Sequence, residues 1–124
     1  MKLCRFDDNR LGRVDGQKVR DISAALDALP EMRWPVPPGD QVISNLDMLQ
    51  PEIENLTTHA PVLDLAAVKL LSPVANPSKI IGAPINYPAH IDEAIADPDL
   101  KQDRTIKTIA DWGLFLKATS LLVG

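Results

Sequence analysis

Hydrophobic and polar residues alternate over the first part of the chain, which is the pattern of short strands with one buried face. Strand-like segments cover Lys2–Phe6, Leu11–Val14 and Gln17–Ile22, and a polar turn cluster separates the first two. Asp15-Gly16 stands between the second and third segments. An Asp-Gly pair predicts a tight type I′ hairpin turn, because both central positions of that turn need positive φ. The first 22 residues are therefore predicted to form a small β-meander.

The pattern then changes to that of helices. Ser23 is predicted to be the N-cap of a short helix over Ala24–Leu29, and Asp40 the N-cap of a longer one. Pro51 lies inside the longer helix and is predicted to kink or split it. Apolar residues on one face of this helix recur at steps of four and three, and we expect them to cover the meander: they are Val42, Leu46, Leu49, Ile53 and Leu56.

Proline is the unusual feature of the composition, with 11 residues in 124. This share is roughly twice the usual value of about 5%. The segment Pro30–Gly39 holds four of these prolines, a density that excludes a helix or a central strand. We predict an extended connector with Trp34 as its apolar anchor.

The second half of the chain predicts short strands that alternate with short helices. One helix is expected to begin at Pro88, since proline suits the first helical turn, and to end before Asp97. Another is expected to be capped by Thr105 and to end near Gly113. The strand candidates are Val68–Leu71, Lys79–Ile85, which we expect to be buried, and Leu114–Lys117.

Charge and apolar runs exclude several classes of protein. Thirteen basic and 17 acidic residues give a net charge of −4 without a basic run, so neither nucleic acid nor a membrane surface is an expected partner. No stretch approaches the roughly 18 apolar residues of a spanning helix. The N-terminus has no apolar signal core, and the single cysteine, Cys4, excludes an internal disulfide. These features predict a cytoplasmic location.

The segment from Asn86 to Glu93 is the main candidate for chemistry. His90 and Glu93 are three residues apart, so on a helix their side chains share a face within hydrogen-bonding reach. A carboxylate on one imidazole nitrogen raises the basicity of the other, which makes a general base for water. The same spacing is also typical of a solvated ion pair, and on these residues alone both interpretations stay open. Glycine-rich phosphate loops, Gly-x-Ser-x-Gly and His-Glu-x-x-His are absent, so nothing supports a nucleotide, α/β-hydrolase or zinc site.

A longer order of residues surrounds this pair. It consists of Leu71–Val74, Asn76–Ile81, Asn86-Tyr87 with His90 and Glu93, Leu114–Lys117, Ser120 and Val123-Gly124. As a set, it resembles the start of the catalytic domain of the fumarylacetoacetate hydrolase family. The residues before Leu70 resemble, more loosely, the small leading domain of bacterial members.

The resemblance implies an α+β fold, in which a small N-terminal β-meander with helices is followed by the first part of a β-rich roll. It implies a leading domain at residues 1–68 and the beginning of an incomplete catalytic domain at residues 69–124. By the same resemblance, His90 and Glu93 are catalytic residues on a short lid helix that activate water or a substrate proton. Lys117 and Tyr87 are the implied substrate-binding residues.

Members of this family are usually homodimers that act on 2-oxo or 1,3-diketo acids by C–C bond hydrolysis, hydration or decarboxylation. They hold Mg²⁺ or Mn²⁺ through three acidic residues, which in the family follow the point where this chain stops. We therefore expect Mg²⁺ or Mn²⁺ in the complete enzyme. We expect no metal ligands, no tightly bound metal and no activity from the 124 residues alone. A second departure is Pro84-Ile85, where members often have glycine shortly before Asn-Tyr.

Three hypotheses follow. The first is the N-terminal part of a metal-dependent enzyme of this family, cut within a domain, because the ending Ser120–Gly124 is apolar whereas natural termini tend to be polar. The second is a stand-alone interaction or dimerisation module without catalysis. Its contact surfaces would be the apolar stripe Val42–Leu56 and the apolar C-terminus. The third is a truncated remnant without function.

Overall fold

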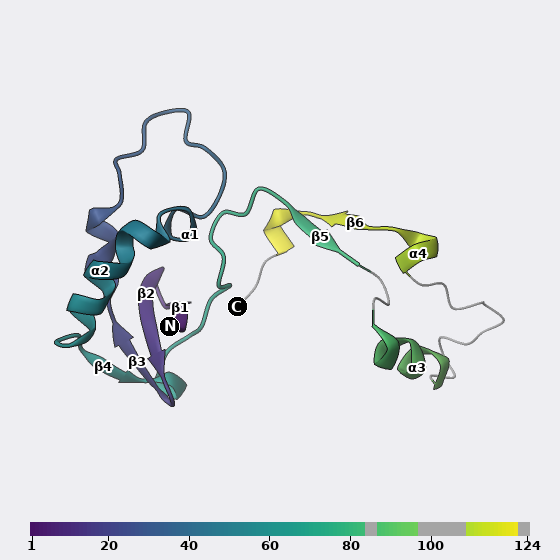
Figure 1. The fold of residues 1–124 in the computed structure, drawn as a ribbon, viewed down its shortest axis with the longest axis horizontal. Coiled ribbons are helices and arrows are strands. Elements are labelled where there is room, and N and C mark those ends of the chain that lie inside the picture. The colour runs from purple at the N-terminus through teal and green to yellow at the C-terminus, as the bar shows by residue number, and fades with distance from the viewer. Residues whose placement is uncertain (84–86, 97–108, 122–124) are drawn as a thin grey trace. The chain divides into compact units, whose positions relative to one another are not determined.

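A computed structural model describes residues 1–83, 87–96 and 109–121 of the chain (Figure 1). The described residues divide into two compact units, Met1–Ser78 and Lys79–Leu121. Predictions that fall on Ile85, on Thr105 or on the last three residues lie outside the described ranges. Within those ranges, no helix is long and apolar enough to cross a membrane.

The first unit is built on a four-stranded antiparallel sheet. Its strands are β1 (Leu3–Phe6), β2 (Arg10–Asp15), β3 (Lys18–Asp21) and β4 (Val62–Asp64), in that order across the sheet. The predicted three-stranded meander is therefore confirmed. The fourth strand was not predicted, because a segment of three residues is too short to show a period of two.

The turn between β2 and β3 differs by one residue from the predicted one. Asp15 pairs with Lys18, so the two loop residues are Gly16 and Gln17 rather than Asp15 and Gly16. Gly16 has a φ of 58°, which a side chain would make costly. Positive φ at the first central residue only is the pattern of a type II′ turn.

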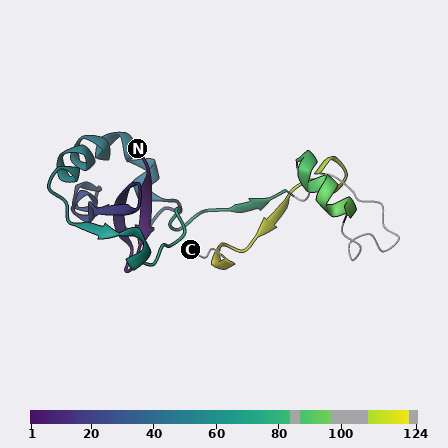
Figure 2. The ribbon, with the colours of Figure 1, turned by 90° about the horizontal axis from the view of Figure 1, so that it is seen from below.

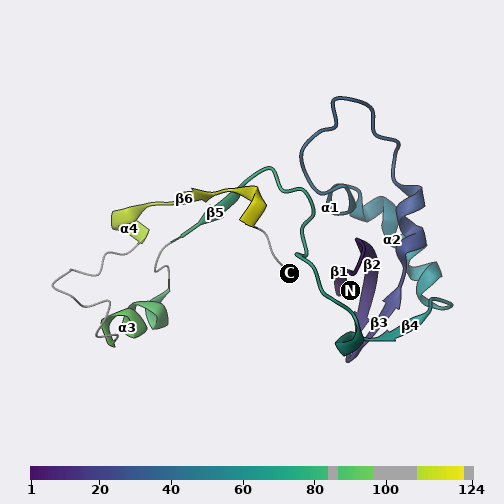
Figure 3. The same cartoon turned by 180° about the vertical axis from the view of Figure 1, so that it is seen from behind.

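Two consecutive helices cover one face of this sheet, α1 (Gln41–Ser44) and α2 (Leu46–Thr57), as Figure 3 shows from behind. The predicted cap is confirmed, because Oδ1 of Asp40 accepts hydrogen bonds from the backbone N–H groups of Val42 (2.9 Å) and Ile43 (3.1 Å). The predicted apolar stripe also faces the sheet and forms the core with it. The fully or almost fully buried members of this core are Leu11, Ile22, Ala25, Leu49 and Ile53.

The helix break lies at Asn45 and not at Pro51, so the predicted split at Pro51 is wrong. Asn45 leaves helical geometry, with φ −116° and ψ 19°, and its side-chain amide donates to the carbonyl of Gln41 at 2.8 Å. Helix α2 continues through Pro51. A proline at this position removes only the donor to the Asp47 carbonyl, one turn earlier. Burial of Leu49 and Ile53 on the opposite side outweighs that loss.

Two further local predictions are wrong. Residues Ser23–Ala28 form a 3₁₀ helix, η1, and Ser23 does not cap it. Instead, the hydroxyl of Ser23 accepts a hydrogen bond from the backbone N–H of Leu11 at 3.0 Å, which ties η1 to β2. Trp34 in the proline-rich connector is 91% exposed and anchors nothing.

The other face of the sheet contains buried Phe6 and Val19. After the short 3₁₀ helix η2 (Leu65–Ala67), the chain runs antiparallel to β1 and forms one bridge, between Phe6 and Leu70. The N–H of Asp7 donates to the Lys69 carbonyl at 2.8 Å, and the N–H of Leu71 donates to the Arg5 carbonyl at 2.8 Å. The strand predicted at Val68–Leu71 is thus a single bridge with two flanking hydrogen bonds.

The described part of the second unit contains a two-stranded antiparallel ladder, β5 (Ile80–Gly82) with β6 (Phe115–Lys117), visible side by side in Figure 2. It also contains α3 (Pro88–Ala96), α4 (Ile109–Trp112) and the 3₁₀ helix η3 (Thr119–Leu121). The helix predicted from Pro88 is confirmed, and both strands are shorter than predicted. The expected burial of β5 is wrong, because Ile81 is 57% exposed. The chain as a whole has the predicted α+β class.

Candidate functional site

The predicted catalytic pair lies on α3, which begins at Pro88. His90 and Glu93 are three positions apart in this helix, and positions with that spacing lie on one helix face. The side chain of Glu93 is exposed. Tyr87 stands directly before the helix and is 53% exposed. Helix α3 therefore presents the Glu93 carboxylate to solvent, and the half-exposed Tyr87 lies directly before its first residue.

Lys117, the other predicted substrate-binding residue, is the last residue of β6. Its ammonium nitrogen lies 5.8 Å from the centre of the Phe115 ring, within the range of a cation–π contact. The register of the ladder sets Lys117 opposite Ile80, at the start of β5, whereas Tyr87 and α3 follow the end of β5. No ion pair joins Lys117 to Glu93 among the residues that the structure describes.

A metal site does not fit the residues in the described ranges. No group of three or more His, Cys, Asp or Glu side chains comes close enough there to hold an ion. The arrangement that remains is a His-Glu pair on a helix, with a tyrosine and a lysine on neighbouring elements. Such groups can move protons and bind carboxylates, because imidazole titrates near neutral pH and ammonium and phenol groups donate hydrogen bonds.

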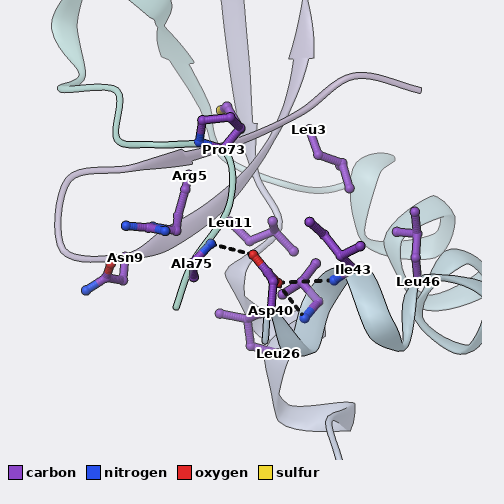
Figure 4. Close-up of a pocket in the computed structure, with 12 residues that line it drawn as sticks. Leu3, Arg5, Asn9, Leu11, Leu26, Asp40, Ile43, Leu46, Pro73 and Ala75 are labelled. Carbon is purple, nitrogen blue, oxygen red and sulfur yellow. Dashed lines mark hydrogen bonds between the residues drawn. The ribbon is translucent and has the colours of Figure 1, made fainter. Parts of the chain in front are cut away.

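The first unit contains a cavity that sequence reasoning missed. Its volume is about 230 Å³, and its walls come from β1, β2, η1, α1, the start of α2 and the segment around Ala75 (Figure 4). The only signal for it in the sequence is the alternation in β1, which places Leu3 and Arg5 on the same face of the strand. None of the predicted site residues lines this cavity.

Polar groups at this cavity have unequal environments. Both carboxylate oxygens of Asp40 are occupied, Oδ1 by the cap of α1 and Oδ2 by the backbone N–H of Ala75 at 2.6 Å. Arg5 differs, because its Nε and Nη1 are buried without a hydrogen-bond partner. Burial also raises the pKa of the Cys4 thiol, since the thiolate is poorly solvated there.

Comparison with known proteins bears on the predicted family. No family model matches the chain. A maleylpyruvate hydrolase from Aquipseudomonas alcaligenes is 51% identical over 126 residues, which cover all of this chain and 44% of that relative. The resemblance to the fumarylacetoacetate hydrolase family is confirmed. The chain spans less than half the length of this curated family member.

Solved structures of a second maleylpyruvate hydrolase are also similar to this chain. The crystal structure of maleylpyruvate hydrolase from Sphingobium sp. SYK-6 aligns with this chain with a TM-score of 0.61 and 32% sequence identity. The alignment covers 94% of this chain and 37% of the Sphingobium chain. A second structure from the same source is a complex with manganese(II) and pyruvate. It aligns with this chain with a TM-score of 0.55 and 38% sequence identity, and the alignment covers 73% of this chain and 34% of the chain in that complex.

Proposed function

We propose that this chain is the N-terminal part of a metal-dependent hydrolase that cleaves a carbon–carbon bond in a 2-oxo or 1,3-diketo acid. The observation that carries the proposal is the 51% identity to a maleylpyruvate hydrolase over the whole of this chain. The position of His90 and Glu93 on one helix, α3, supports it, because that arrangement suits a general base and the group that orients it. Hydration and decarboxylation, the other reactions of the family, are less favoured because the relatives are named as hydrolases.

In this proposal, the imidazole of His90 accepts a proton from a water molecule while the carboxylate of Glu93 holds the ring. The water oxygen forms a bond to a carbonyl carbon, and the neighbouring C–C bond breaks. The electron pair of that C–C bond moves into an enolate of the departing 2-oxo acid. The proton on His90 is then transferred to the enolate carbon that was released from the broken bond. Tyr87 and Lys117 are proposed to bind substrate carboxylates, which phenol and ammonium groups can do as hydrogen-bond donors.

A divalent ion, Mn²⁺ or Mg²⁺, is part of the proposal because a relative was solved with manganese(II) and pyruvate. Such an ion polarises oxygens of the substrate and stabilises developing negative charge. We assign no reaction step to it, since the described residues of this chain offer no ligand set. A homodimer and a cytoplasmic location complete the proposal.

The test uses the complete protein that carries these residues, with Mn²⁺ added and release of pyruvate from maleylpyruvate as the assay. We expect His90→Ala to lower turnover by roughly 10²–10⁴-fold, which is the contribution of a general base. Mn²⁺ affinity should stay nearly unchanged, since His90 is not proposed to bind the metal. Glu93→Gln should lower kcat less, and should shift the acid limb of the pH profile. The matched control is His59→Ala, since His59 is an exposed histidine of the first unit. Unchanged turnover in His90→Ala would rule out the assignment of this dyad.

A second candidate function is a stand-alone interaction or dimerisation module. It is favoured by exposed apolar side chains at β6, where Leu114, Phe115 and Leu116 are 64%, 44% and 72% exposed. The stripe along α2 cannot serve such a partner, because Leu49 and Ile53 are fully buried inside the first unit. Sedimentation of the purified chain tests this function. A folded chain that stays monomeric at all concentrations contradicts it.

A further inference from the structure

One face of the β5–β6 ladder combines a glycine, an aromatic ring and a lysine. In the register of the two strands, Gly82 lies opposite Phe115 (Figure 1). Side chains alternate between the two faces of a strand, so Phe115 and Lys117 project from the same face of β6. Leu116, between them, projects from the other face. The cation that is proposed to bind substrate therefore shares a face with the ring.

The ring of Phe115 lies directly against the backbone of Gly82. A Cβ at position 82 would lie 2.5 Å from Cζ, 2.7 Å from Cε2 and 2.9 Å from Cε1 of this ring. Carbon atoms in van der Waals contact are separated by about 3.5–4.0 Å, so each of these approaches is too close. The missing side chain at Gly82 thus lets the ring lie across from β6 onto β5, and any larger residue would displace it.

The same ring is the group that the charge of Lys117 meets. The ammonium nitrogen lies 5.8 Å from the ring centre, inside the limit of about 6 Å for a cation–π contact. In the described part of the chain, no carboxylate pairs with Lys117. An acidic partner would hold the ammonium group but would compete with a substrate carboxylate for it. An aromatic face attracts the cation without neutralising its charge.

We propose that Phe115 is a positioning residue for Lys117, and that Gly82 is required because it lets the ring lie across the ladder. The inference rests on the proposed function, in which Lys117 binds a carboxylate of the substrate. The long, flexible stem of a lysine loses conformational entropy when a bound substrate orders it. The ring reduces this loss, because it holds the ammonium group in place before the substrate binds.

The test measures kcat and KM of the complete protein with Mn²⁺ added and maleylpyruvate as substrate. Phe115→Leu keeps an apolar side chain but removes the aromatic face. We expect KM to rise roughly two- to thirtyfold, which corresponds to the range of cation–π contacts. The value of kcat should stay nearly the same, because a group bound equally in the ground and transition states affects KM alone. Unaltered KM in Phe115→Leu overturns the proposal.

Leu116→Met is the matched control for this variant. It changes the next residue of β6, whose side chain projects from the opposite face of the ladder and is 72% exposed. Leucine and methionine also have similar volumes, so the exchange is well tolerated. We therefore expect Leu116→Met to leave KM unchanged. A rise in KM equal to that of Phe115→Leu would mean that any change in this strand weakens substrate binding, and it would overturn the specific role of the ring.

Gly82→Ala provides a second test that leaves both the ring and the lysine in the chain. The added methyl group would meet the outer end of the Phe115 side chain, so it should move the ring and spare the fold even if Phe115→Leu fails to fold. We expect KM to rise within the same range. In the Phe115→Leu background there is no ring to displace, so the methyl group should have no further effect. Unaltered KM in Gly82→Ala overturns the proposal.

A double-mutant cycle separates positioning from general support of the fold. Lys117→Met removes the charge and should raise KM. In that background, Phe115→Leu should raise KM no further, because the ring has no ammonium group to hold. An equal rise with and without the ammonium group would mean that the ring only supports the fold, and it would overturn the proposal.

The same variants distinguish failure of this inference from failure of the proposed function. If Lys117→Met raises KM and Phe115→Leu does not, the positioning inference alone is overturned. If Lys117→Met leaves KM unchanged, the substrate-binding role of Lys117 is wrong and the positioning role of Phe115 is overturned with it. The assignment of His90 as general base is tested separately, by the loss of turnover in His90→Ala.

Discussion

Asp40 connects two parts of the first unit that are 35 residues apart in sequence, and its removal should destabilise that unit measurably. One oxygen caps α1 through Val42 and Ile43, and the other accepts the backbone N–H of Ala75. Loss of an N-cap costs about 1 kcal/mol. Loss of a hydrogen bond to a charged group costs about 1.5–3 kcal/mol. We therefore expect Asp40→Ala to lower the free energy of unfolding by about 2.5–4 kcal/mol, a large part of the roughly 5–15 kcal/mol of a typical domain.

Asp40→Asn divides this loss between the two oxygens. Asparagine is about as good an N-cap as aspartate, so the bonds to Val42 and Ile43 should survive. Its amide nitrogen, however, is a donor and would face the N–H of Ala75. This variant should therefore lose only the second contribution, about 1.5–3 kcal/mol.

Urea unfolding followed by far-ultraviolet circular dichroism is the appropriate assay. Tryptophan emission is a poor alternative because Trp34 is 91% exposed and changes its surroundings little on unfolding. Asp27→Ala is the control, since Asp27 is exposed, and such surface changes are usually within about 0.5 kcal/mol. If Asp40→Ala falls within that margin, Asp40 does not hold these segments together. If Asp40→Asn is as stable as the unaltered chain, the bond to Ala75 contributes nothing.

Two further predictions concern β1 and β2. A Cβ at Gly12 would lie 2.5 Å from Cγ1 of Val19 and 2.9 Å from Sγ of Cys4. Gly12→Ala should therefore lower the urea midpoint of unfolding, through an overpacking cost of about 1–3 kcal/mol. An unchanged midpoint would show that the Val19 side chain moves aside without cost. Because burial raises the pKa of the Cys4 thiol, iodoacetamide should alkylate it more slowly at neutral pH in the folded chain than in urea. As the pH rises, the thiol ionises at a lower pH in the unfolded chain than in the folded chain. The free energy of unfolding therefore falls as the pH rises from the unfolded pKa through the raised pKa of the folded chain. Equal alkylation rates in the folded chain and in urea would contradict the burial of Cys4.

Local patterns predicted the meander, the capped amphipathic helix and α3, because each of these depends on neighbours in sequence. The turn around Gly16 was misplaced by one residue, since a glycine suits either central position of a tight turn. The interpretation of Ser23 as a cap missed its bond to Leu11, which lies across the unit and leaves no local signal. Trp34 was expected to anchor the proline-rich connector as an apolar residue, but it is exposed, because an apolar residue type does not reveal whether a surface is available to bury it.

The candidate site shows the same division. The spacing of His90 and Glu93 places both on one face of a helix, and the helix is present. Their roles stay a prediction, because catalysis depends on groups that come from elsewhere in a fold. The cavity at Arg5 was missed for a related reason. Its walls come from several segments that are far apart in the sequence, and no local pattern records that an arginine lacks an acceptor.

The hydrogen bonds between residues 69–71 and β1 have a consequence for self-association. An outer strand with free N–H and C=O groups is a template for strands of other molecules. At β1, the bonds of Asp7 and Arg5 to this segment already occupy such groups. In the described residues of the second unit, by contrast, both strands of the β5–β6 ladder are outer strands, and Ile81 and Leu116 on them are exposed. The β1 edge of the first sheet is thus protected against edge-to-edge aggregation by its own chain, whereas both edges of the ladder are open among the described residues.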